Sequence, residues 1–546
     1  MGTGRKGMLA ANTRMPSHTQ YKSAKIKEMR VSGMRLRQHS ECYNPASAMP
    51  NRLPSIAEHE TASSRHSIAT FLSSIRFQLA LVTLSAAALY LFKLGAGALL
   101  DWDEATYAQI AREMAAGGHW LSPTWAHQPF FKKPPLLFWL QAGLFHCFGV
   151  SEFWARIPSA LAAVAVVLLV YFIARRLASP AAGLLAAFAL MTMNHFDRAA
   201  REGMTDALLC FCIFLALYAW LRLCREEPAW FYLLCTAVGL GIMIKGPAVL
   251  VGPAAIAADW LILREPEKLI ATRHYFLGAL LLLAIVAPWH IWMIVHFGRA
   301  FLHQYVGIEL ATRVTTKFEG SGGGPAYYLR VILSGAFPWS FVALIALGRW
   351  IWSKQWSDSL LWILAGIVLI GYSVLPTGHQ WYILPAYPAL AIEVGRLLAD
   401  SSERWRVVRY ASIVMLAAGI LVAFIKLAQR QGDPFTNQVA QLATMAAGRG
   451  HSGPLLVIPE PETNSRLDVP TAVFYSNRPA VFIDIPEDDS RLAELLKRYN
   501  SMDAVIQNGA VMDLSPSYRI CVKAQNSAAN YAEMSPRKLS ALQTHR

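Results

Sequence analysis

Charged residues are scarce in this chain: Asp, Glu, Lys and Arg make up only 16% of its 546 residues, whereas hydrophobic residues make up 55%. An average soluble domain has about 25% charged residues. Long apolar stretches recur between Phe77 and Ala428. The composition therefore indicates one large membrane-embedded body and excludes a series of soluble domains.

Cysteine is also rare, with seven residues and no Cys-x-x-Cys pair. Cys210 and Cys212 are two positions apart within an apolar run, which is typical of small buried hydrophobic residues and not of a metal site. Cys521 is the only cysteine after residue 430, so a disulfide within that region is excluded. We predict no metal site and no cofactor.

The net charge of +15 does not indicate a nucleic-acid partner, because of where the basic residues lie. Residues 1–70 contain eleven Lys or Arg against four Asp or Glu, and most other basic residues fall in short loops between apolar runs. This pattern orients membrane proteins and attracts anionic lipid headgroups. We therefore predict contacts with membrane lipids and none with nucleic acid.

Residues 1–70 lack a compact apolar core followed by a cleavage site, which excludes a signal peptide. They are polar, basic and without a sustained period, so we predict a disordered cytoplasmic extension. A true start at Met34 or Met49 is the alternative.

Residues 71–430 predict a polytopic α-helical membrane domain with about eleven spans. Several apolar segments are shorter than the ~20 residues that cross a bilayer. Segment 135–149 opens with two prolines and is short, so we expect a re-entrant or interfacial piece. The expected spans lie near residues 77–99, 157–174, 180–194, 206–222, 229–244, 246–263, 275–297, 327–348, 359–376, 381–398 and 407–428.

Basic residues predict the orientation, because clusters such as Arg175–Arg176 and Arg349 with Lys354 fall in alternate loops. If these loops are cytoplasmic, the N-terminus is inside and eleven spans place the C-terminus outside. Three loops then lie on the outer face: 101–156, 195–205 and 298–326.

Residues 431–546 have a different character, with short β-branched and aromatic runs that predict strands. We expect a small α/β domain outside the membrane. The predicted strands are Leu455–Ile458, Thr471–Tyr475, Ala480–Ile485, Ala504–Gln507 and Tyr518–Val522, and the predicted helix is Ser490–Tyr499.

The first outer loop holds three acids, Asp101, Asp103 and Glu104, at the start of a predicted helix that ends at Gly117. A carboxylate at the membrane surface can act as a general base or a metal ligand. The same spacing is that of a capping box, and acids are common at helix starts. Both interpretations stay open at this point.

Two lysines, Lys132 and Lys133, precede two prolines in the same loop and form a cationic rim that suits a phosphate-bearing lipid. Alternatively, they merely extend from the next apolar segment toward water. Asp206 stands at the mouth of a later span, where an ionisable residue is a functional candidate, although it could also cap the helix. His379, in a tight outer turn, could bind phosphate or be structural.

Six short motifs occur in one order along the chain. They are Asp103-Glu104 with Tyr107-Ala-Gln-Ile-Ala-Arg112, Gly118-His-Trp120, Lys133-Pro-Pro-Leu-Leu-Phe-Trp139, Phe148 to Arg156, Pro338-Trp339-Ser340 and Tyr382-Ile-Leu-Pro385. In this order they resemble the GT-C class of lipid-to-acceptor glycosyltransferases. The branch they resemble contains the lipid A aminoarabinose transferases and the bacterial relatives of protein O-mannosyltransferases.

The resemblance implies roles for four residues. Asp103 matches the aspartate taken as catalytic base, Asp206 matches a second aspartate at the active-site mouth, and Lys133 and Arg313 match cations near the donor phosphate. Three departures are also present. Lys132 stands where the family often has Glu, Leu310 follows Glu309 where the family often has His, and the lysine usual before Tyr382 is missing, with His379 nearby. Because of these departures, the resemblance does not imply that this chain uses the same acceptor as its relatives or binds a metal that they bind.

The predicted function is transfer of a sugar from a polyprenyl-phosphate donor to a hydroxyl or phosphate acceptor, with inversion, at the periplasmic face of the inner membrane. The acceptor would be a lipid A-like lipid, an envelope glycan or a protein. Asp103, or else Glu104 or Asp206, would be the base, and cations would stabilise the leaving phosphate. A flippase for lipid-linked sugars is the alternative, and the sequence shows neither the paired halves nor the broken mid-membrane helices expected of it. A non-catalytic receptor would not need the clustered acids.

Overall fold

The computed structural model describes residues 74–100, 103–224, 227–263, 271–312, 315–316, 323–354, 359–404, 417–421, 424–425, 433–448, 453–458, 470–483, 489–499, 501–507, 518–527 and 529–536, with single residues elsewhere. The prediction for residues 1–70 and most of the predicted span 407–428 lie outside the described residues.

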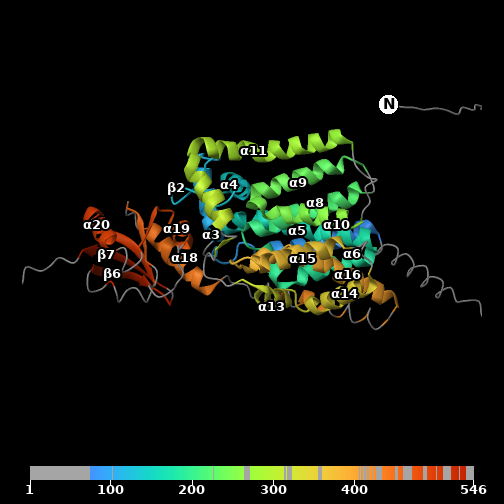
Figure 1. Ribbon diagram of the computed structural model, residues 1–546. Helices are drawn as coiled ribbons and strands as arrows, with labels where there is room; N and C mark the ends of the chain where they lie inside the picture. Colours follow the sequence, from blue (N-terminus) through green and yellow to red (C-terminus); the bar gives the residue numbers. More distant parts are fainter. Residues whose placement is uncertain are drawn as a thin grey trace, which may run out of the picture. The chain divides into compact units, whose positions relative to one another are not determined.

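Most of the described residues between 74 and 404 are helical (Figure 1). Their bounds are α2 (Ile75–Leu91), α3 (Asp103–Gly117), α4 (Leu136–Phe148), α5 (Glu152–Leu177), α6 (Pro180–Thr192), α7 (Asn194–Ala200), α8 (Thr205–Leu223), α9 (Trp230–Lys245), η1 (Gly246–Leu250), α10 (Val251–Leu263), α11 (Thr272–Leu302), η3 (His303–Thr312), α13 (Pro325–Gly335), α14 (Trp339–Ser353), α15 (Leu360–Ser373), η5 (Gln380–Ile383) and α16 (Ala386–Arg404). Two short strands, β1 (Thr124–Trp125) and β2 (Gln128–Pro129), form a hairpin between α3 and α4.

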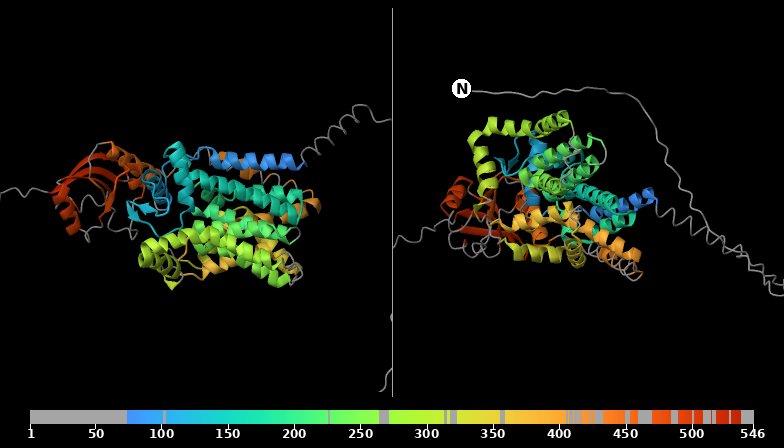
Figure 2. Two further views of the ribbon diagram at one scale, coloured as in Figure 1. Left: turned by 90° about the horizontal axis from the view of Figure 1, so that it is seen from above. Right: turned by 45° about the vertical axis from the view of Figure 1, so that its right-hand side comes forward.

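Helix α5 lies at the centre of the helical bundle, where it packs against α2, α6, α8 and α16 (Figures 1 and 2). Its start is fixed locally, because the Ser151 hydroxyl accepts a hydrogen bond from the Trp154 N–H at 3.4 Å. Arg175 and Arg176 end it, where cations favour the helix dipole. The bundle core is apolar around the whole of α5, as expected for a helix with helices on several sides.

Four helical stretches among the described residues are long and apolar enough to cross a membrane: Glu152–Leu177, Thr205–Leu223, Trp230–Leu261 and Thr272–Thr312. Helices α13 and α14 would together form a fifth, but they are bent by 116°. Helices α2, α4, α6 and α15 are apolar and have 13 to 17 residues, short of the ~20 that a straight span needs. The number of about eleven spans therefore stays a prediction.

Two predicted spans were wrong in their extent. The segment 77–99 is helical only as far as Leu91, and 327–348 is split between α13 and α14. Pro338 lies at the second break, and proline has no N–H to continue the hydrogen-bond ladder. The first break has a tertiary cause: Arg201 donates hydrogen bonds to the carbonyl groups of Leu89, Tyr90, Phe92 and Lys93.

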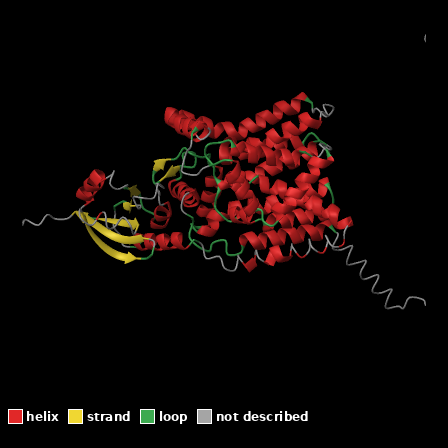
Figure 3. Ribbon diagram, turned by 60° about the horizontal axis from the view of Figure 1, so that its bottom comes forward, coloured by secondary structure: helices red, strands yellow, loops and turns green. Residues whose placement is uncertain are grey.

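The C-terminal region (residues 433–536) contains a five-stranded sheet in the order β4-β3-β5-β7-β6 (Figure 3). Strand β3 pairs in parallel with β4 and β5, and β7 pairs antiparallel with β5 and β6. The element bounds are α18 (Pro434–Ala447), β3 (Leu455–Ile458), α19 (Pro470–Ser476), β4 (Ala480–Phe482), α20 (Asp489–Tyr499), β5 (Met502–Gln507), β6 (Tyr518–Gln525) and β7 (Ala529–Pro536).

Alternate residues of β3 face opposite sides of this sheet, as the period of two requires. Leu456 and Ile458 pack in one cluster with Leu492 and Leu496 of α20. Leu455 and Val457 pack in the other, with apolar residues of α18 and α19. The sheet is thus buried on both faces around β3.

The predicted strand Thr471–Tyr475 was wrong, because these residues form helix α19. Pro470 opens this helix, a position where proline is favourable. Strand β7 was not predicted, whereas β3 and α20 lie within one residue of their predicted bounds.

Candidate active site

Asp103 is the first residue of α3, and Tyr107 follows it by one helical turn. Asp103 is half-buried, and Tyr107 is fully buried. Burial is the main reason why the pKa of Tyr107 lies well above its usual value, and the next causes are the charge of Asp103 and a hydrogen bond to it. The charges of Asp206 and Glu309 raise this pKa further.

Asp206 lies in the first turn of α8 and is paired with Lys245, the last residue of α9. The Lys245 ammonium group is 2.6 Å from Oδ1 of Asp206; the Asp206 side chain is buried, and 13% of the Lys245 side chain is exposed. The other oxygen, Oδ2, is buried and has no hydrogen-bond partner among the described residues. Asp206 does not cap α8 through its side chain. The helix-cap interpretation of Asp206 is therefore wrong.

A second ion pair joins the half-buried Lys133 to the buried Glu309, with Nζ 3.3 Å from Oε2. Glu309 lies on η3, a π-helical stretch that continues α11. Phe131 packs its ring against Phe297 and Phe301 at the end of α11, which holds the two lysines beside η3. Wide helical turns of this kind are frequent at functional sites.

A small pocket adjoins Asp206. Asp206 brings to its wall the carboxylate that has an open acceptor position. The lining also contains an Arg, a second acid and two residues from the turn before α16. The lining residues are His195, Arg198, Ala199, Glu202, Met204, Asp206, Gln380 and Trp381.

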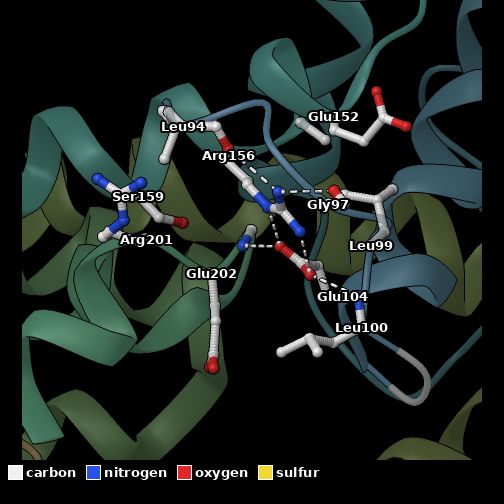
Figure 4. Close-up of polar contacts among 12 residues, drawn as sticks. Leu94, Gly97, Leu99, Leu100, Glu104, Glu152, Arg156, Ser159, Arg201 and Glu202 are labelled. Atoms are coloured by element: carbon white, nitrogen blue, oxygen red, sulfur yellow. Dashed lines mark hydrogen bonds and ion pairs between the residues drawn. The ribbon is translucent and has the colours of Figure 1, made fainter. Parts of the chain in front are cut away.

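Glu104 has a different environment from Asp103, because its carboxylate is buried and fully hydrogen-bonded (Figure 4). Arg156 of α5 donates to both of its oxygens, at 2.8 and 3.1 Å. The N–H groups of Leu100 and Gly203 donate to it as well, at 2.6 and 2.7 Å. Glu104 thus joins α3 to α5 and to the loop before α8, and so ties together the helices that carry Asp103 and Asp206.

Close packing against Ala155 requires a glycine at position 203, where the loop before α8 meets α5. A Cβ atom at this position would lie 2.9 Å from the carbonyl oxygen of Ala155, closer than real Cβ atoms approach. The glycine lets the loop before α8 come within hydrogen-bond distance of Glu104.

The other predicted phosphate-binding residues have different positions. Lys132 is exposed, next to the half-buried Lys133. His379 is half-buried and stacks on Trp381, with 4.6 Å between ring centroids. Arg313 lies outside the described residues. Among the described residues, no group of three or more His, Cys, Asp or Glu residues could hold a metal ion.

Sequence reasoning did not select Lys245 or Tyr107 as site residues. Lys245 ends the run Ile-Met-Ile-Lys, where a lysine is typical of the charged flank of a span. The signal that could have identified Lys245 is that an ionisable residue within a membrane span is a functional candidate.

The fold is similar to that of two groups of solved enzymes. The structure of ArnT from Cupriavidus metallidurans bound to undecaprenyl phosphate matches with a TM-score of 0.69 and 20% identity, over 84% of this chain and 98% of that chain. An oligosaccharyltransferase from Archaeoglobus fulgidus matches with a TM-score of 0.53 and 13% identity, over 79% and 69%. The fold is therefore that of a multi-pass membrane protein of the GT-C type.

Comparisons of sequence agree with this class. Residues 132–292 match the family described as dolichyl-phosphate-mannose-protein mannosyltransferase. An uncharacterized protein of Aquifex aeolicus is 30% identical over 320 residues, which cover 58% of this chain and 71% of that protein. An undecaprenyl phosphate-alpha-4-amino-4-deoxy-L-arabinose arabinosyl transferase of Pseudomonas fluorescens is 28% identical over 371 residues, 63% of this chain.

The match spans 64% of the Pseudomonas transferase, which is less than two thirds of its length. The chain belongs to the GT-C family of membrane glycosyltransferases, and the family prediction is confirmed.

Proposed function

We propose that this chain transfers a sugar from a polyprenyl-phosphate donor to a hydroxyl or phosphate group of an acceptor. The observation that carries the proposal is a pair of buried acids, Asp206 and Glu309, each with a lysine beside it, Lys245 at 2.6 Å and Lys133 at 3.3 Å. Acids beside cations are the groups that this transfer needs, because one proton must be removed and one phosphate must leave as an anion.

Asp103 is the proposed general base. It is half-buried, and the hydrogen bond from Tyr107 leaves its carboxylate with further acceptor positions. In the proposed step, Asp103 takes the proton of the acceptor hydroxyl while the oxygen attacks the anomeric carbon. The bond from that carbon to the phosphate oxygen breaks, and its electron pair leaves with the polyprenyl phosphate. Attack opposite to the phosphate inverts the anomeric centre.

Lys133 is the proposed contact to the leaving phosphate. Its ammonium group donates to Oε2 of Glu309 at 3.3 Å and to the Lys132 carbonyl oxygen at 3.4 Å, so its positive charge lies beside η3. Lys132 and Arg313 would add positive charge at the same group. The open oxygen of Asp206 would accept a hydrogen bond from the acceptor or the sugar, and so orient it.

The proposed acceptors are a lipid A-like lipid, an envelope glycan or a protein, and the proposed site faces the periplasm at the inner membrane. A polyprenyl-phosphate donor is supported by relatives such as the Pseudomonas fluorescens transferase, whose name gives an undecaprenyl phosphate-linked sugar as its donor. The orientation is supported by the alternation of basic loops in the sequence.

The test uses the purified full-length chain in proteoliposomes. Undecaprenyl phosphate carrying radiolabelled glucose, mannose or 4-amino-4-deoxyarabinose is supplied as donor, and lipid A, an envelope glycan fraction and periplasmic protein as acceptors. We expect label in one acceptor, release of undecaprenyl phosphate in equal amount, and an inverted anomer by NMR. No transfer from any donor would overturn the proposal.

The same vesicles test the flippase alternative. The 116° bend between α13 and α14 is a broken helix of the kind that transporters contain, which gives this alternative one structural feature in its favour. Movement of the labelled donor between leaflets without any transfer would favour the flippase.

A further inference from the structure

The segment that leads into α3, residues 94–100, is held from two directions. We propose that the C-terminal region positions Asp103 for catalysis by clamping Leu99, with Tyr475 as the positioning residue of this clamp. The inference rests on the proposed function of Asp103 as general base. It assigns a role in the reaction to the C-terminal region, none of whose described residues belongs to the candidate site.

The clamp consists of three hydrogen bonds to two adjacent residues of the segment. The Leu99 N–H donates to the Tyr475 hydroxyl at 3.0 Å, and the Leu99 carbonyl oxygen accepts from the Thr471 hydroxyl at 3.3 Å. The Ala98 N–H donates to Oδ1 of Asn437 at 2.7 Å. Leu99 is fully buried, so these backbone groups would lose hydrogen bonds outright without the clamp.

The bundle holds the same segment from the other side (Figure 4). Arg156 donates to the carbonyl oxygens of Leu94, Ala96, Gly97 and Ala98 at 2.9 to 3.3 Å. Arginine with five fixed donors suits this task, because it can bind several carbonyl groups and a carboxylate at once.

Leu100 transmits the position of this segment to α3. Its N–H donates to Oε2 of Glu104 at 2.6 Å, and its carbonyl oxygen accepts from the N–H of Ala105 at 3.1 Å. Both partners lie in the first turn of α3, directly after Asp103. A shift of Leu99 would therefore be passed to the start of the helix that carries Asp103.

Tyr475 also contacts α5. Its hydroxyl accepts from Leu99 and donates to Oε1 of Glu152 at 2.7 Å, so one group joins the segment, α5 and the C-terminal region. Burial is the main cause that raises the pKa of Tyr475, and the hydrogen bond to Glu152 raises it further. The hydroxyl thus keeps the proton that it donates.

Helix α19 also contacts α3 itself, through Arg112 of α3. The guanidinium group lies over the ring of Phe474, 4.1 Å from the centroid, and donates a hydrogen bond to the Phe474 carbonyl oxygen. The C-terminal region therefore meets both the segment before α3 and the side of α3. A displacement of about 1 Å at a reacting group can cost up to ~100-fold in rate, so such contacts are able to control turnover.

The test compares Tyr475→Phe with the wild-type full-length chain. The variant keeps the ring and removes the hydroxyl that holds Leu99. Thr471→Val, which removes the second hydroxyl, is an independent test of the clamp. Tyr499→Phe, at an exposed tyrosine of the same region, is the matched control.

We expect two effects from Tyr475→Phe and from Thr471→Val. Amide hydrogen exchange at residues 98–100 should become about two- to tenfold faster, as loss of one hydrogen bond implies. The kcat with the best donor–acceptor pair of the proteoliposome assay should fall about tenfold, while the KM for the donor and binding of undecaprenyl phosphate stay unchanged. Tyr499→Phe should change none of these.

A double-mutant cycle separates positioning from general stability. If Tyr475 acts through Asp103, Tyr475→Phe should have no further effect on the residual kcat of Asp103→Asn. An unchanged kcat in both clamp variants, or an equal loss in the Asp103→Asn background, would overturn the clamp. A wild-type chain that transfers no sugar would instead overturn the proposed function, so the two failures are distinguishable.

Discussion

The ammonium group of Lys245 lies 2.6 Å from Oδ1 of Asp206, and this contact joins the end of α9 to the start of α8. The neighbouring ring of Tyr382 lies under the same ammonium group, 5.7 Å from its centroid. Both charges are buried, so each stabilises the other where water cannot. The pair thereby places a carboxylate with one open oxygen at the pocket wall.

Removal of one partner should leave an unpaired buried charge. We expect Lys245→Met to lower the free energy of unfolding by about 3–5 kcal/mol, measured by denaturation in detergent. The double variant Lys245→Met/Asp206→Asn should recover most of this loss. Arg349→Met, which breaks an equally short but half-exposed pair with Asp400, is the control and should cost less than about 1 kcal/mol. Equal losses for both lysine and arginine variants would contradict this view of the site.

Asp103 and Glu104 are neighbours with different expected roles. Asp103→Asn should lower transfer by roughly 10²–10⁴-fold, because a general base is lost, while the protein folds normally. Glu104→Gln should instead lower stability, since it weakens a buried pair with Arg156. Turnover per folded molecule and melting in detergent separate the two. Normal turnover by folded Asp103→Asn would remove Asp103 as the base and favour Asp206.

Lys133 is expected to bind the phosphate of the lipid carrier. Lys133→Ala should weaken binding of undecaprenyl phosphate by about 1.5–3 kcal/mol, the value of a hydrogen bond to a charged group. Arg313→Ala should act in the same direction. Lys354→Ala, at the end of α14, is the control and should leave binding unchanged. Equal binding in all three variants would mean that Lys133 only extends toward water.

The sequence pattern was sufficient for elements that local signals define. Helix α20 has strong amphipathic spacing and was predicted to within one residue. The predicted span 157–174 lies within α5, which begins earlier, at Glu152, where Ser151 caps it. The end of α2 could not be predicted, because Arg201 comes from more than a hundred residues away to bind its last carbonyl groups. Helix α19 was missed because its β-branched and aromatic residues favour strands in isolation.

The same distinction holds for the candidate site. Asp103 and Asp206 could be selected because each acid stands at the edge of an apolar segment. Lys245 could not, because a lysine at the end of a span is ordinary until the fold brings Asp206 beside it. The assignment of Glu104 to a structural pair depends on Arg156, which no local spacing connects to it.

The lowered pKa of His195 leads us to expect that the stability of the protein depends on pH. Burial is the main cause that lowers the pKa of His195 to about 4, and Arg198 lowers it further. The folded state therefore stays neutral while the unfolded state takes up a proton below about 6.5. The contribution of His195 to the free energy of unfolding should be fully present above that pH. It should decrease as the pH drops from about 6.5 to 4, by at most about 3 kcal/mol.

Melting in detergent between pH 7.5 and 5 measures this effect in wild type and in His195→Asn. The asparagine amide can replace Nδ1 as the hydrogen-bonding group toward the Tyr387 hydroxyl, which lies 2.9 Å from Nδ1. The variant should therefore lose part of the pH slope and keep its stability at pH 7.5. Glu202 has a raised pKa through burial and acts with the opposite sign, so it cannot produce the same change. His119→Asn, at an exposed position, should keep the wild-type slope.

Transfer is expected to continue in excess chelator. Glu309 and Asp206 are the two buried acids of the site, and each already has an ammonium group beside it, at 3.3 and 2.6 Å. A divalent cation would have to enter against these positive charges, which costs energy in a buried site. Lys132 adds a further cation where relatives often have an acid. The test measures turnover of purified enzyme with the active donor–acceptor pair, in chelator alone and with a divalent ion restored. Equal rates are expected; a loss that the ion reverses would show that the lysines do not supply the charge needed at the phosphate.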